Sequence, residues 1–280
     1  MGVVVTGASS GLGFAVAAEL AREGFMTFGT VRRLEDGAAL KAAGVAPVRM
    51  DVTDVSSIVA ALRSVRDGLA GRPLYGLVNN AGIPAAGPLE LMPLEELRHV
   101  LEVNLVGQVA VTQAFLPLLK ACPGGGRIVN MSSLAGRAAM PFLGPYAASK
   151  FALEAVSDAL RRELAPTGVR VVVIEPGNMQ SKIWDKVEQM DLSRYRGTPY
   201  ERAMMHVRAQ SLRGGRAAPP ATLVASAVLR ALSAARPPIR IVVSRHSWLD
   251  AIITRLPARL LDWLIGKTVW RERKKSQNVE

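Results

Sequence analysis

Short runs of β-branched and apolar residues alternate along the chain with longer segments in which apolar residues recur every three or four positions. The short runs predict buried strands, and the longer segments predict helices that cover them. The expected strands span residues 2–5, 25–31, 47–52, 74–82, 126–133, 168–177 and 239–244. The expected helices span residues 13–23, 56–69, 94–120, 145–164 and 219–235.

Near-continuous apolar strands separated by helices are typical of a parallel sheet that is covered on both faces. Because such crossovers are right-handed, the pattern predicts an α/β fold, a Rossmann-like doubly wound parallel sheet of about seven strands. The chain has no fixed-period repeat and no proline-rich linker, so we expect one catalytic domain over residues 1–244. Within it, the polar, arginine-rich residues 178–216 are expected to form a substrate lid.

The composition narrows the possible chemistry. Hydrophobic residues make up 49% of the 280 residues, which argues against disorder. The single cysteine, Cys122, cannot form an internal disulfide, and the three histidines lie far apart, so no metal site is expected.

The chain does not open on a secretory signal, and we expect a cytoplasmic location. The first residues match a myristoylation pattern, but a buried strand over the valines is the favoured interpretation.

The net charge of +12 belongs entirely to the last third of the chain. Residues 1–191 contain 18 basic and 18 acidic residues, whereas residues 192–280 contain 17 and 5. This asymmetry suggests an anionic partner surface, and a solvated basic face explains it equally well. The basic third has no nucleic-acid recognition motif, so no nucleic-acid partner is expected.

Residues 245–280 are expected to form an amphipathic basic C-terminal helical extension. Tryptophan and leucine alternate there with arginine and lysine, and two aspartates interrupt the apolar run, which argues against a membrane-spanning helix. Peripheral contact with an anionic membrane fits this composition. A helix that caps the pocket or forms a subunit interface is the alternative.

The segment TGASSGLG, residues 6–13, joins the first predicted strand to the first predicted helix. Glycines at such a junction let the backbone approach a pyrophosphate, and the helix N-terminus offers unpaired N–H groups. The spacing of Gly7, Gly11 and Gly13 is wider than in G-x-G-x-x-G. The position in a strand-loop-helix setting therefore predicts a dinucleotide site more strongly than the glycines alone.

The end of the second strand predicts which dinucleotide is preferred. An acidic residue there would bind the ribose hydroxyls of NAD, but this chain has Val31 followed by Arg32 and Arg33. Arginine can meet a 2′-phosphate with two donors at once. We therefore expect NADP(H) in preference to NAD(H), with Arg32 as the main contact. The alternative is that both arginines merely begin a solvated helix.

The segment PYAASKFALEA places Tyr146 and Lys150 four positions apart, and therefore on one face of a helix. With the glycine loop and the segments DVTD, NNAG, VNLVG, MSS and PG, in that order, the chain resembles the short-chain dehydrogenase/reductase family. The resemblance covers residues 2–180 firmly and extends loosely to 244. The run SSLAGR…PYAASKFALEA most resembles the hydroxysteroid and retinol dehydrogenase branch. The resemblance implies a homodimer or homotetramer.

The resemblance also implies a set of site residues. The implied catalytic residues are Asn104, Ser133, Tyr146 and Lys150, with Ser133 preferred to Ser132 because it lies 13 positions before the tyrosine. The implied cofactor-binding residues are Gly7, Ser9, Ser10, Gly11, Leu12, Gly13, Arg32, Arg33, Asp51, Val52, Asn80, Ala81, Gly82, Tyr146, Lys150, Pro176, Gly177, Met179 and Ser181.

Hydride transfer to a ketone builds negative charge on oxygen, which calls for a nearby proton donor. We expect Tyr146 to be that donor and Ser133 to orient the substrate oxygen. Lys150, with an oxidised nicotinamide, is expected to lower the pKa of Tyr146 and to hold the ribose hydroxyls. Asn104 is expected to hold a water near Lys150, and the alternative for it is a helix-packing amide.

The segments around the expected site are apolar, which favours a small lipophilic ketone, aldehyde or alcohol, steroid- or retinoid-like, as substrate. The residues expected to contact it are Leu134, Met140, Phe142, Leu143, Ile183 and Trp184. The function predicted from the sequence is thus that of an NADP(H)-dependent oxidoreductase. The alternative is a catalytically silent protein of the same fold that senses the cofactor or acts as a scaffold at a membrane surface.

Overall fold

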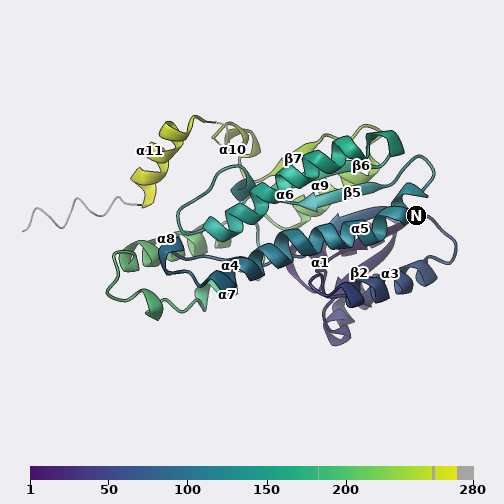
Figure 1. Cartoon of the computed structure of the whole chain (residues 1–280), viewed down its shortest axis with the longest axis horizontal. Coiled ribbons are helices and arrows are strands. Elements are labelled where there is room, and N and C mark those ends of the chain that lie inside the picture. The colour runs from purple at the N-terminus through teal and green to yellow at the C-terminus, as the bar shows by residue number, and fades with distance from the viewer. Residues whose placement is uncertain (182, 254–255, 270–280) are drawn as a thin grey trace, which may run out of the picture.

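A parallel sheet forms the centre of the computed structural model, which describes residues 1–181, 183–253 and 256–269 (Figure 1). Its seven strands are β1 (Gly2–Val5), β2 (Met26–Val31), β3 (Ala46–Arg49), β4 (Leu74–Asn79), β5 (Arg127–Met131), β6 (Arg170–Pro176) and β7 (Arg240–Val243). They lie in the order β3-β2-β1-β4-β5-β6-β7, and every described pair is parallel. The predicted doubly wound sheet is confirmed, and its switch point, where this fold binds ligands, lies between β1 and β4.

Helices cover both faces of the sheet and extend one end of it. They are α1 (Gly11–Arg22), α2 (Ala38–Ala42), α3 (Val55–Leu69), α4 (Leu94–Leu101), α5 (Gly107–Lys120), α6 (Gly144–Glu163), α7 (Ile183–Glu188), α8 (Glu201–Arg216), α9 (Thr222–Ser233), α10 (Ser247–Ile253) and α11 (Ala258–Val269).

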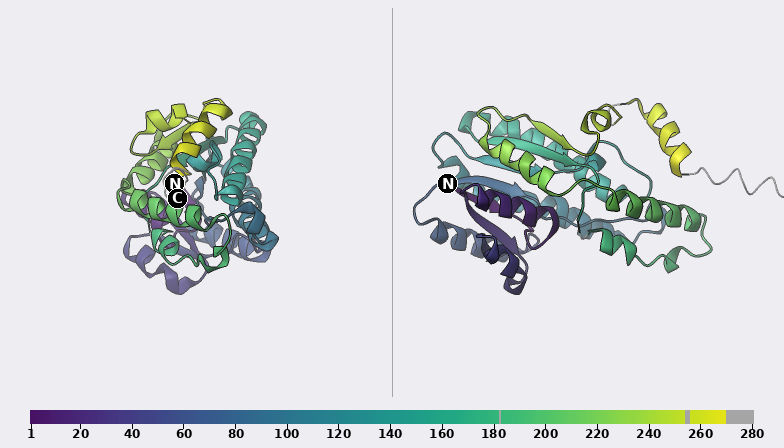
Figure 2. Two further views of the ribbon diagram at one scale, coloured as in Figure 1. Left: turned by 90° about the vertical axis from the view of Figure 1, so that its left-hand side faces the viewer. Right: turned by 180° about the vertical axis from the view of Figure 1, so that it is seen from behind.

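Alternating strand side chains divide the interior into two cores. On β1, Val3 and Val5 pack with α1 and α9, whereas Val4 points to the opposite face and packs with α3 and α5. The two views of Figure 2 show these helical layers on either side of the sheet. Burial on both faces explains why the strands read as continuous apolar runs instead of alternating ones.

The segment predicted as one long helix, residues 94–120, contains a change of helix type. α4 passes into a π-helical turn, Glu102–Val106, before α5 begins. By length and composition alone, Leu94–Lys120 is apolar enough to cross a membrane. Its residues Val111, Phe115 and Leu119 are fully buried in the core against the sheet, which accounts for the apolar composition.

Four helices gather beyond the carboxyl ends of the strands: α7, α8, α10 and α11 (Figure 1, left). The expected lid segment thus contains two helices, and the described part of the C-terminal extension contains two more. Residues 270–280 of that predicted extension lie outside the described residues. A small apolar cluster joins α8 and α11 to the loop before α6, and its buried members are Phe142, Tyr195, Ala203, Met204 and Val269.

Candidate active site

The glycine loop between β1 and α1 is shaped by close backbone contacts. Gly7 and Gly11 have φ values of 64° and 59°, a region that favours glycine. A Cβ at Gly13 would lie 2.3 Å from the Gly7 carbonyl oxygen and 2.4 Å from Asn80 Nδ2. Ser10, at the N-cap of α1, makes no side-chain cap hydrogen bond. The start of α1 therefore lies against a tight loop and keeps N–H groups for an anion.

Thr6 and Asn80 fasten this loop to the end of β4. Thr6 Oγ1 accepts hydrogen bonds from the backbone N–H groups of Asn80 and Ala81 at 2.9 and 2.8 Å. Asn80 Nδ2 donates to the carbonyl oxygens of Thr6 and Gly7 at 2.8 and 3.1 Å. Asn80 thus supports the loop, and its predicted contact with a cofactor stays a prediction; the role of Thr6 was not predicted. Its only sequence signal was its position directly before the first glycine.

A cavity of about 370 Å³ lies over the loop and extends toward the end of β2. The predicted cofactor residues that line it are Gly7, Ser9, Ser10, Gly11, Leu12, Gly13, Arg32, Asp51, Val52, Asn80, Ala81, Gly82 and Ser181. Further lining residues, not predicted for the cofactor, are Thr30, Val31, Met50, Thr53, Ile83, Pro84, His99, Val103 and Ile183. The tight glycine loop, which has no room for a Cβ at Gly13, and the open helix N-terminus fit a dinucleotide phosphate.

The two arginines after β2 have different surroundings. Arg32 lines the cavity near Asp51, whose pKa is lowered by hydrogen bonds from the N–H and hydroxyl of Thr53, with a further contribution from the charge of Arg32. Arg33 instead reaches Asp36, with 3.2 Å between Nη2 and Oδ1, and does not line the cavity. Only Arg32 therefore lies where it can meet a cofactor phosphate.

Tyr146, Lys150 and Ser133 come together at the carboxyl ends of β5 and β6. Lys150 Nζ lies 5.7 Å from the centroid of the Tyr146 ring and donates a 2.8 Å hydrogen bond to the Met131 carbonyl oxygen. Ser133 shares a side-chain hydrogen bond with Tyr146, and its hydroxyl lies 3.4 Å from the Pro176 carbonyl oxygen. Ser132 Oγ is buried and has no hydrogen-bond partner among the described residues. The arrangement favours Ser133 over Ser132 for contact with a substrate.

Burial governs the protonation of this group. It raises the pKa of Tyr146, and the hydrogen bond with Ser133 offsets only part of the effect. Burial also lowers the pKa of Lys150 to about 8, against the opposing charge of Glu154. The lowering of the tyrosine pKa expected from Lys150 is therefore not found among the protein's own groups: burial raises this pKa, and the contribution that opposes it comes from Ser133. A phenol that stays protonated at neutral pH suits a proton donor.

Asn104 lies in the π-helical turn, and its side chain is fully engaged. Its Oδ1 accepts from the Ile83 N–H at 2.8 Å, and its Nδ2 donates to the Ile83 carbonyl oxygen at 2.9 Å and to Ser149 Oγ at 3.1 Å. These bonds hold the loop after β4 against α6, next to Lys150. Asn104 thus has the packing role considered as its alternative, and its role in holding water stays a prediction.

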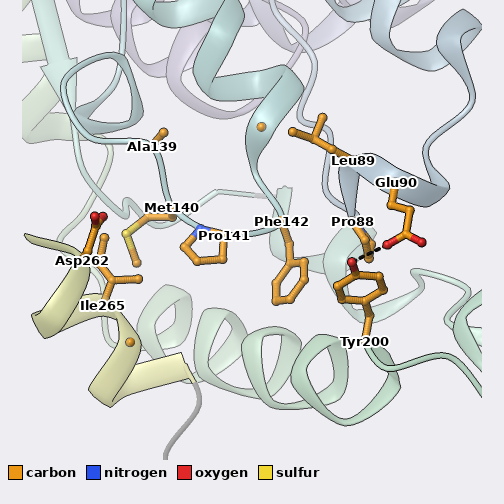
Figure 3. A pocket seen from close by; sticks show the side chains of 12 residues that line it. Pro88, Leu89, Glu90, Ala139, Met140, Pro141, Phe142, Tyr200, Asp262 and Ile265 are labelled. Carbon is orange, nitrogen blue, oxygen red and sulfur yellow. Dashed lines mark hydrogen bonds between the residues drawn. The ribbon is translucent and has the colours of Figure 1, made fainter. Parts of the chain in front are cut away.

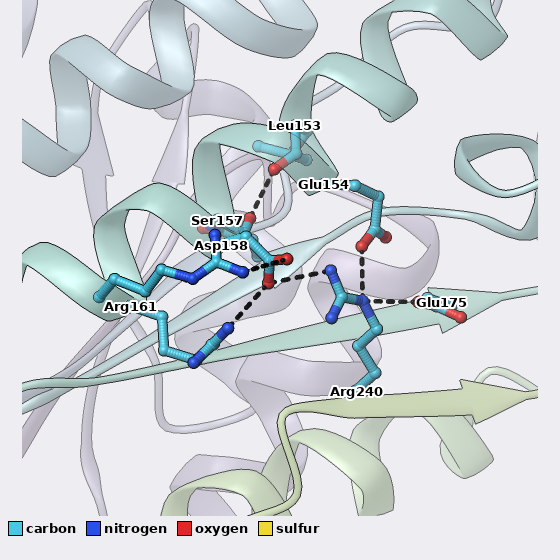
Figure 4. Close-up of polar contacts among 9 residues, drawn as sticks. Leu153, Glu154, Ser157, Asp158, Arg161, Glu175 and Arg240 are labelled. Atoms are coloured by element: carbon cyan, nitrogen blue, oxygen red, sulfur yellow. Dashed lines mark hydrogen bonds and ion pairs between the residues drawn. The ribbon is translucent and has the colours of Figure 1, made fainter. Parts of the chain in front are cut away.

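An ion cluster continues along α6 beyond Lys150 (Figure 4). Arg240 of β7 lies 2.9 Å from Glu154, 3.0 Å from Asp158 and 3.4 Å from Glu175. Glu154 is buried one helical turn after Lys150, so α6 presents a phenol, an ammonium and a carboxylate on successive turns. This cluster was not predicted from the sequence, although the spacing of four residues continues from Tyr146 to Asp158.

A second cavity, of about 530 Å³, opens beside the N-terminus of α6 (Figure 3). We call it the outer cavity, and it is lined by Pro88, Leu89, Glu90, Ala139, Met140, Pro141, Phe142, Gly144, Tyr200, Asp262, Ile265 and Gly266. The Phe142 ring meets the Tyr200 ring edge-on with centroids 6.1 Å apart, and the Tyr200 hydroxyl donates to Glu90. Phe142 has a φ of 67°, and its carbonyl oxygen accepts a 2.7 Å hydrogen bond from the Gly87 N–H. A strained aromatic residue therefore forms part of the wall.

Two of the six predicted substrate residues, Met140 and Phe142, line the outer cavity, and Leu143 precedes α6 without lining it. Ile183 lines the cofactor cavity instead. Trp184 lines neither: its Nε1 donates to the Met179 carbonyl oxygen at 2.8 Å, and its ring lies where a Cβ of Gly215 would be.

Leu134, Pro176, Gly177 and Met179 also lie outside both linings. Leu134 packs against Gly177, whose N–H donates to the Val243 carbonyl oxygen at 2.9 Å, and Met179 is buried in the core. These residues support the ends of β6 and β7. Loop side chains have no periodicity that would reveal which way they point, so the sequence did not separate them from the lining.

The comparisons with known proteins agree with this geometry. Residues 2–192 match the family model described as short chain dehydrogenase. An NADPH-dependent 3-dehydrocapnine reductase from Ornithobacterium rhinotracheale is 35% identical over 271 residues, which cover 94% of this chain and 95% of that protein. Retinol dehydrogenase 16 from Mus musculus is 42% identical over 179 residues, which cover 62% of this chain and 56% of that protein. The crystal structure of a short chain dehydrogenase/reductase from Burkholderia phymatum in complex with NAD has a TM-score of 0.78 at 25% identity and covers 94% of both chains.

Proposed function

This chain belongs to the short-chain dehydrogenase/reductase family, and we propose that it is an NADP(H)-dependent oxidoreductase that interconverts a lipophilic ketone or aldehyde and its alcohol. One observation carries the proposal: Ser133, Tyr146 and Lys150 meet at the sheet edge that also holds the cofactor cavity. A protonated phenol beside a buried cation, next to a dinucleotide cradle, suits carbonyl reduction.

In the direction of reduction, bound NADPH supplies the hydride. Ser133 Oγ donates a hydrogen bond to the substrate oxygen and holds it near the phenol. Tyr146 transfers its proton to that oxygen as negative charge develops, and the adjacent ammonium of Lys150 stabilises the phenolate that remains. The hydrogen bonds of Asn104 fix the loop after β4 against α6, which keeps this face of the helix in place.

The preference for NADP(H) rests on Arg32. It lines the cofactor cavity, and no acidic side chain takes the place of Val31 at the end of β2. One full-length relative is named as NADPH-dependent, while a structural neighbour holds NAD. The charge of Arg32 would attract a 2′-phosphate, which NAD does not have.

The proposed substrate class rests on the outer cavity. Leu89, Met140, Phe142 and Ile265 give it an apolar wall, and Gly144 brings it within two residues of Tyr146. An apolar wall of this kind favours a steroid-, retinoid- or long-chain carbonyl over a small charged one. A homodimer or homotetramer and a cytoplasmic location remain predictions.

A substrate panel tests the proposal. Steroid, retinoid and aliphatic carbonyl compounds are offered with NADPH or NADH, and loss of reduced-cofactor absorbance is measured. We expect turnover of at least one lipophilic carbonyl, and loss of about a thousandfold in kcat for Tyr146→Phe with NADPH binding retained. Full activity of Tyr146→Phe would exclude the mechanism, and cofactor binding without turnover of any compound would favour the silent sensor.

A further inference from the structure

The helices α10 and α11 expose large apolar side chains. On α10, Trp248 and Ile252 are 70% and 53% exposed, and on α11, Leu260 and Trp263 are 44% and 54% exposed. Apolar residues scattered singly over a surface are ordinary, but here each of two successive short helices exposes a tryptophan and an aliphatic side chain. We call these four side chains the tail face.

α11 has two apolar faces, of which the fold uses one. At about 100° per residue, Leu260, Trp263 and Lys267 lie on one side of the helix, while Ile265 and Val269 lie on the other. The second side packs in the apolar cluster with Phe142 and α8. α11 is thus already anchored, and a helix with only one side in the core would carry polar residues on its outer side. The outer tryptophan and leucine have no role in this packing.

Basic side chains accompany the tail face. Lys267 Nζ lies 3.6 Å from the centroid of the Trp263 ring, and Arg259 is exposed on the same helix. The whole net charge of +12 belongs to residues 192–280. Tryptophan beside lysine and arginine is the composition of helices that lie in the headgroup region of a bilayer. Anionic phospholipid therefore complements both the charge and the apolar side chains.

A second copy of the chain fits this face less well. A two-fold contact would place the tail face against its own copy, so that both partners would bring the same positive charges, Lys267 and Arg259, to the interface. Like charges that face each other across an interface are unfavourable. Lipid headgroups bring the opposite charge, and acyl chains accept the apolar side chains.

We propose that α10 and α11 dock the protein on an anionic phospholipid bilayer, with the outer cavity opening beside it. α11 supplies Asp262, Ile265 and Gly266 to the lining of that cavity, so the helix that meets the lipid also borders the substrate pocket (Figure 3). A lipophilic carbonyl then passes from the bilayer into the cavity without crossing water. This last step rests on the proposed function, whereas the docking does not.

Vesicle flotation of the full-length chain tests the docking. The protein is mixed with vesicles of phosphatidylcholine alone or of phosphatidylcholine with phosphatidylglycerol, at low and at high salt. We expect binding to the anionic vesicles at low salt, weakened by high salt. Trp263→Ser, Leu260→Ser and Trp248→Ser should each weaken it by about tenfold, since each removes an apolar side chain from lipid.

Two matched variants and one activity assay make the test decisive. Leu223→Ser and Ile239→Ser remove side chains that are both 46% exposed on the body of the protein, and should leave vesicle binding unchanged. The proposal would be overturned if these controls lost as much vesicle binding as the tail-face variants, or if the protein did not float with anionic vesicles at low salt. It would also be overturned if the protein bound no vesicles and formed a dimer that Trp263→Ser dissociates. Turnover of a water-soluble carbonyl should be unaffected by the tail-face variants. Flotation of a protein that turns over no carbonyl would support docking and count against the proposed function only.

Discussion

The cofactor cavity and the outer cavity lie at the same end of the sheet but are built from different parts of the chain. The first is shaped by backbone: Gly7, Gly13 and the end of β4 approach so closely that an added Cβ would overlap a carbonyl oxygen. The second is formed by residues 88–90 and 139–144, by Tyr200 at the N-cap of α8, and by α11. Backbone contacts leave little room for substitution, whereas loop side chains change without disturbing the sheet. We therefore expect the first cavity to hold the common chemistry and the second to select the substrate.

The largest expected difference between the two cavities is the effect of one added methyl group on the affinity for NADPH. Gly13→Ala places a Cβ against the Gly7 carbonyl oxygen, so the affinity for NADPH should fall by about a hundredfold. Gly266→Ala, in the outer cavity, adds a Cβ with nothing within 4 Å and should leave NADPH affinity unchanged. Quenching of protein fluorescence by NADPH measures both. If Gly13→Ala and Gly266→Ala changed the affinity for NADPH to the same extent, the distinction between the two cavities would be wrong.

A charge reversal at the end of β2 should alter which cofactor is used without altering the choice of ketone. Arg32→Asp removes the proposed phosphate contact, so the ratio of kcat/KM for NADPH to that for NADH should fall on the order of tenfold or more. Arg33→Asp is the control, because that side chain pairs with Asp36 outside the cavity. An unchanged ratio in Arg32→Asp would contradict the assigned cofactor preference.

Tyr146 and Lys150 line neither cavity, and their role should be visible in the pH dependence of turnover. The pKa of Lys150 is about 8, so kcat/KM for reduction should decline above pH 8 as the ammonium is lost. Glu154→Gln removes the negative charge that supports the ammonium, lowers the lysine pKa further and moves this decline to lower pH. Relative to the unmutated protein, kcat/KM of Glu154→Gln should therefore be reduced several-fold more at pH 8 than at neutral pH.

Asp158→Asn is the matched control for this pH effect. Asp158 shares Arg240 with Glu154 but lies a further turn from Lys150. A purely structural role of the ion cluster would lower kcat/KM equally at every pH in both variants. If kcat/KM of Glu154→Gln declines at the same pH as in the unmutated protein, the Glu154 carboxylate does not act on the pKa of Lys150.

The smallest effect is expected at the outer cavity. Tyr200→Phe removes the hydrogen bond to Glu90 but keeps the ring against Phe142, so KM for the carbonyl substrate should change by about threefold. KM for NADPH should not change. Tyr75→Phe loses a comparable hydrogen bond, to the Leu232 carbonyl oxygen away from both cavities, and should leave both constants unaltered. A change in KM for NADPH with Tyr200→Phe would mean that the cavities are coupled.

The sequence by itself determined the features that depend on short-range backbone geometry and on periodicity. Seven apolar runs predicted seven parallel strands, because burial on both faces leaves no polar alternation. The spacing of Tyr146 and Lys150 predicted a shared helix face, because four residues make about one turn. The glycines of residues 6–13 predicted a tight strand-to-helix loop, because a Cβ at Gly7 or Gly13 would overlap neighbouring backbone atoms.

Only the tertiary structure decided which side chains share an environment. Arg240 reaches Glu154 from 86 residues away, and Trp184 packs on Gly215 instead of lining either of the two cavities. The raised pKa of Tyr146 likewise sums the desolvation by all the atoms around it, which no local motif records. Contacts between segments that are distant in sequence are selected by packing over the whole fold, so their partners cannot be inferred from the spacing of residues along the chain.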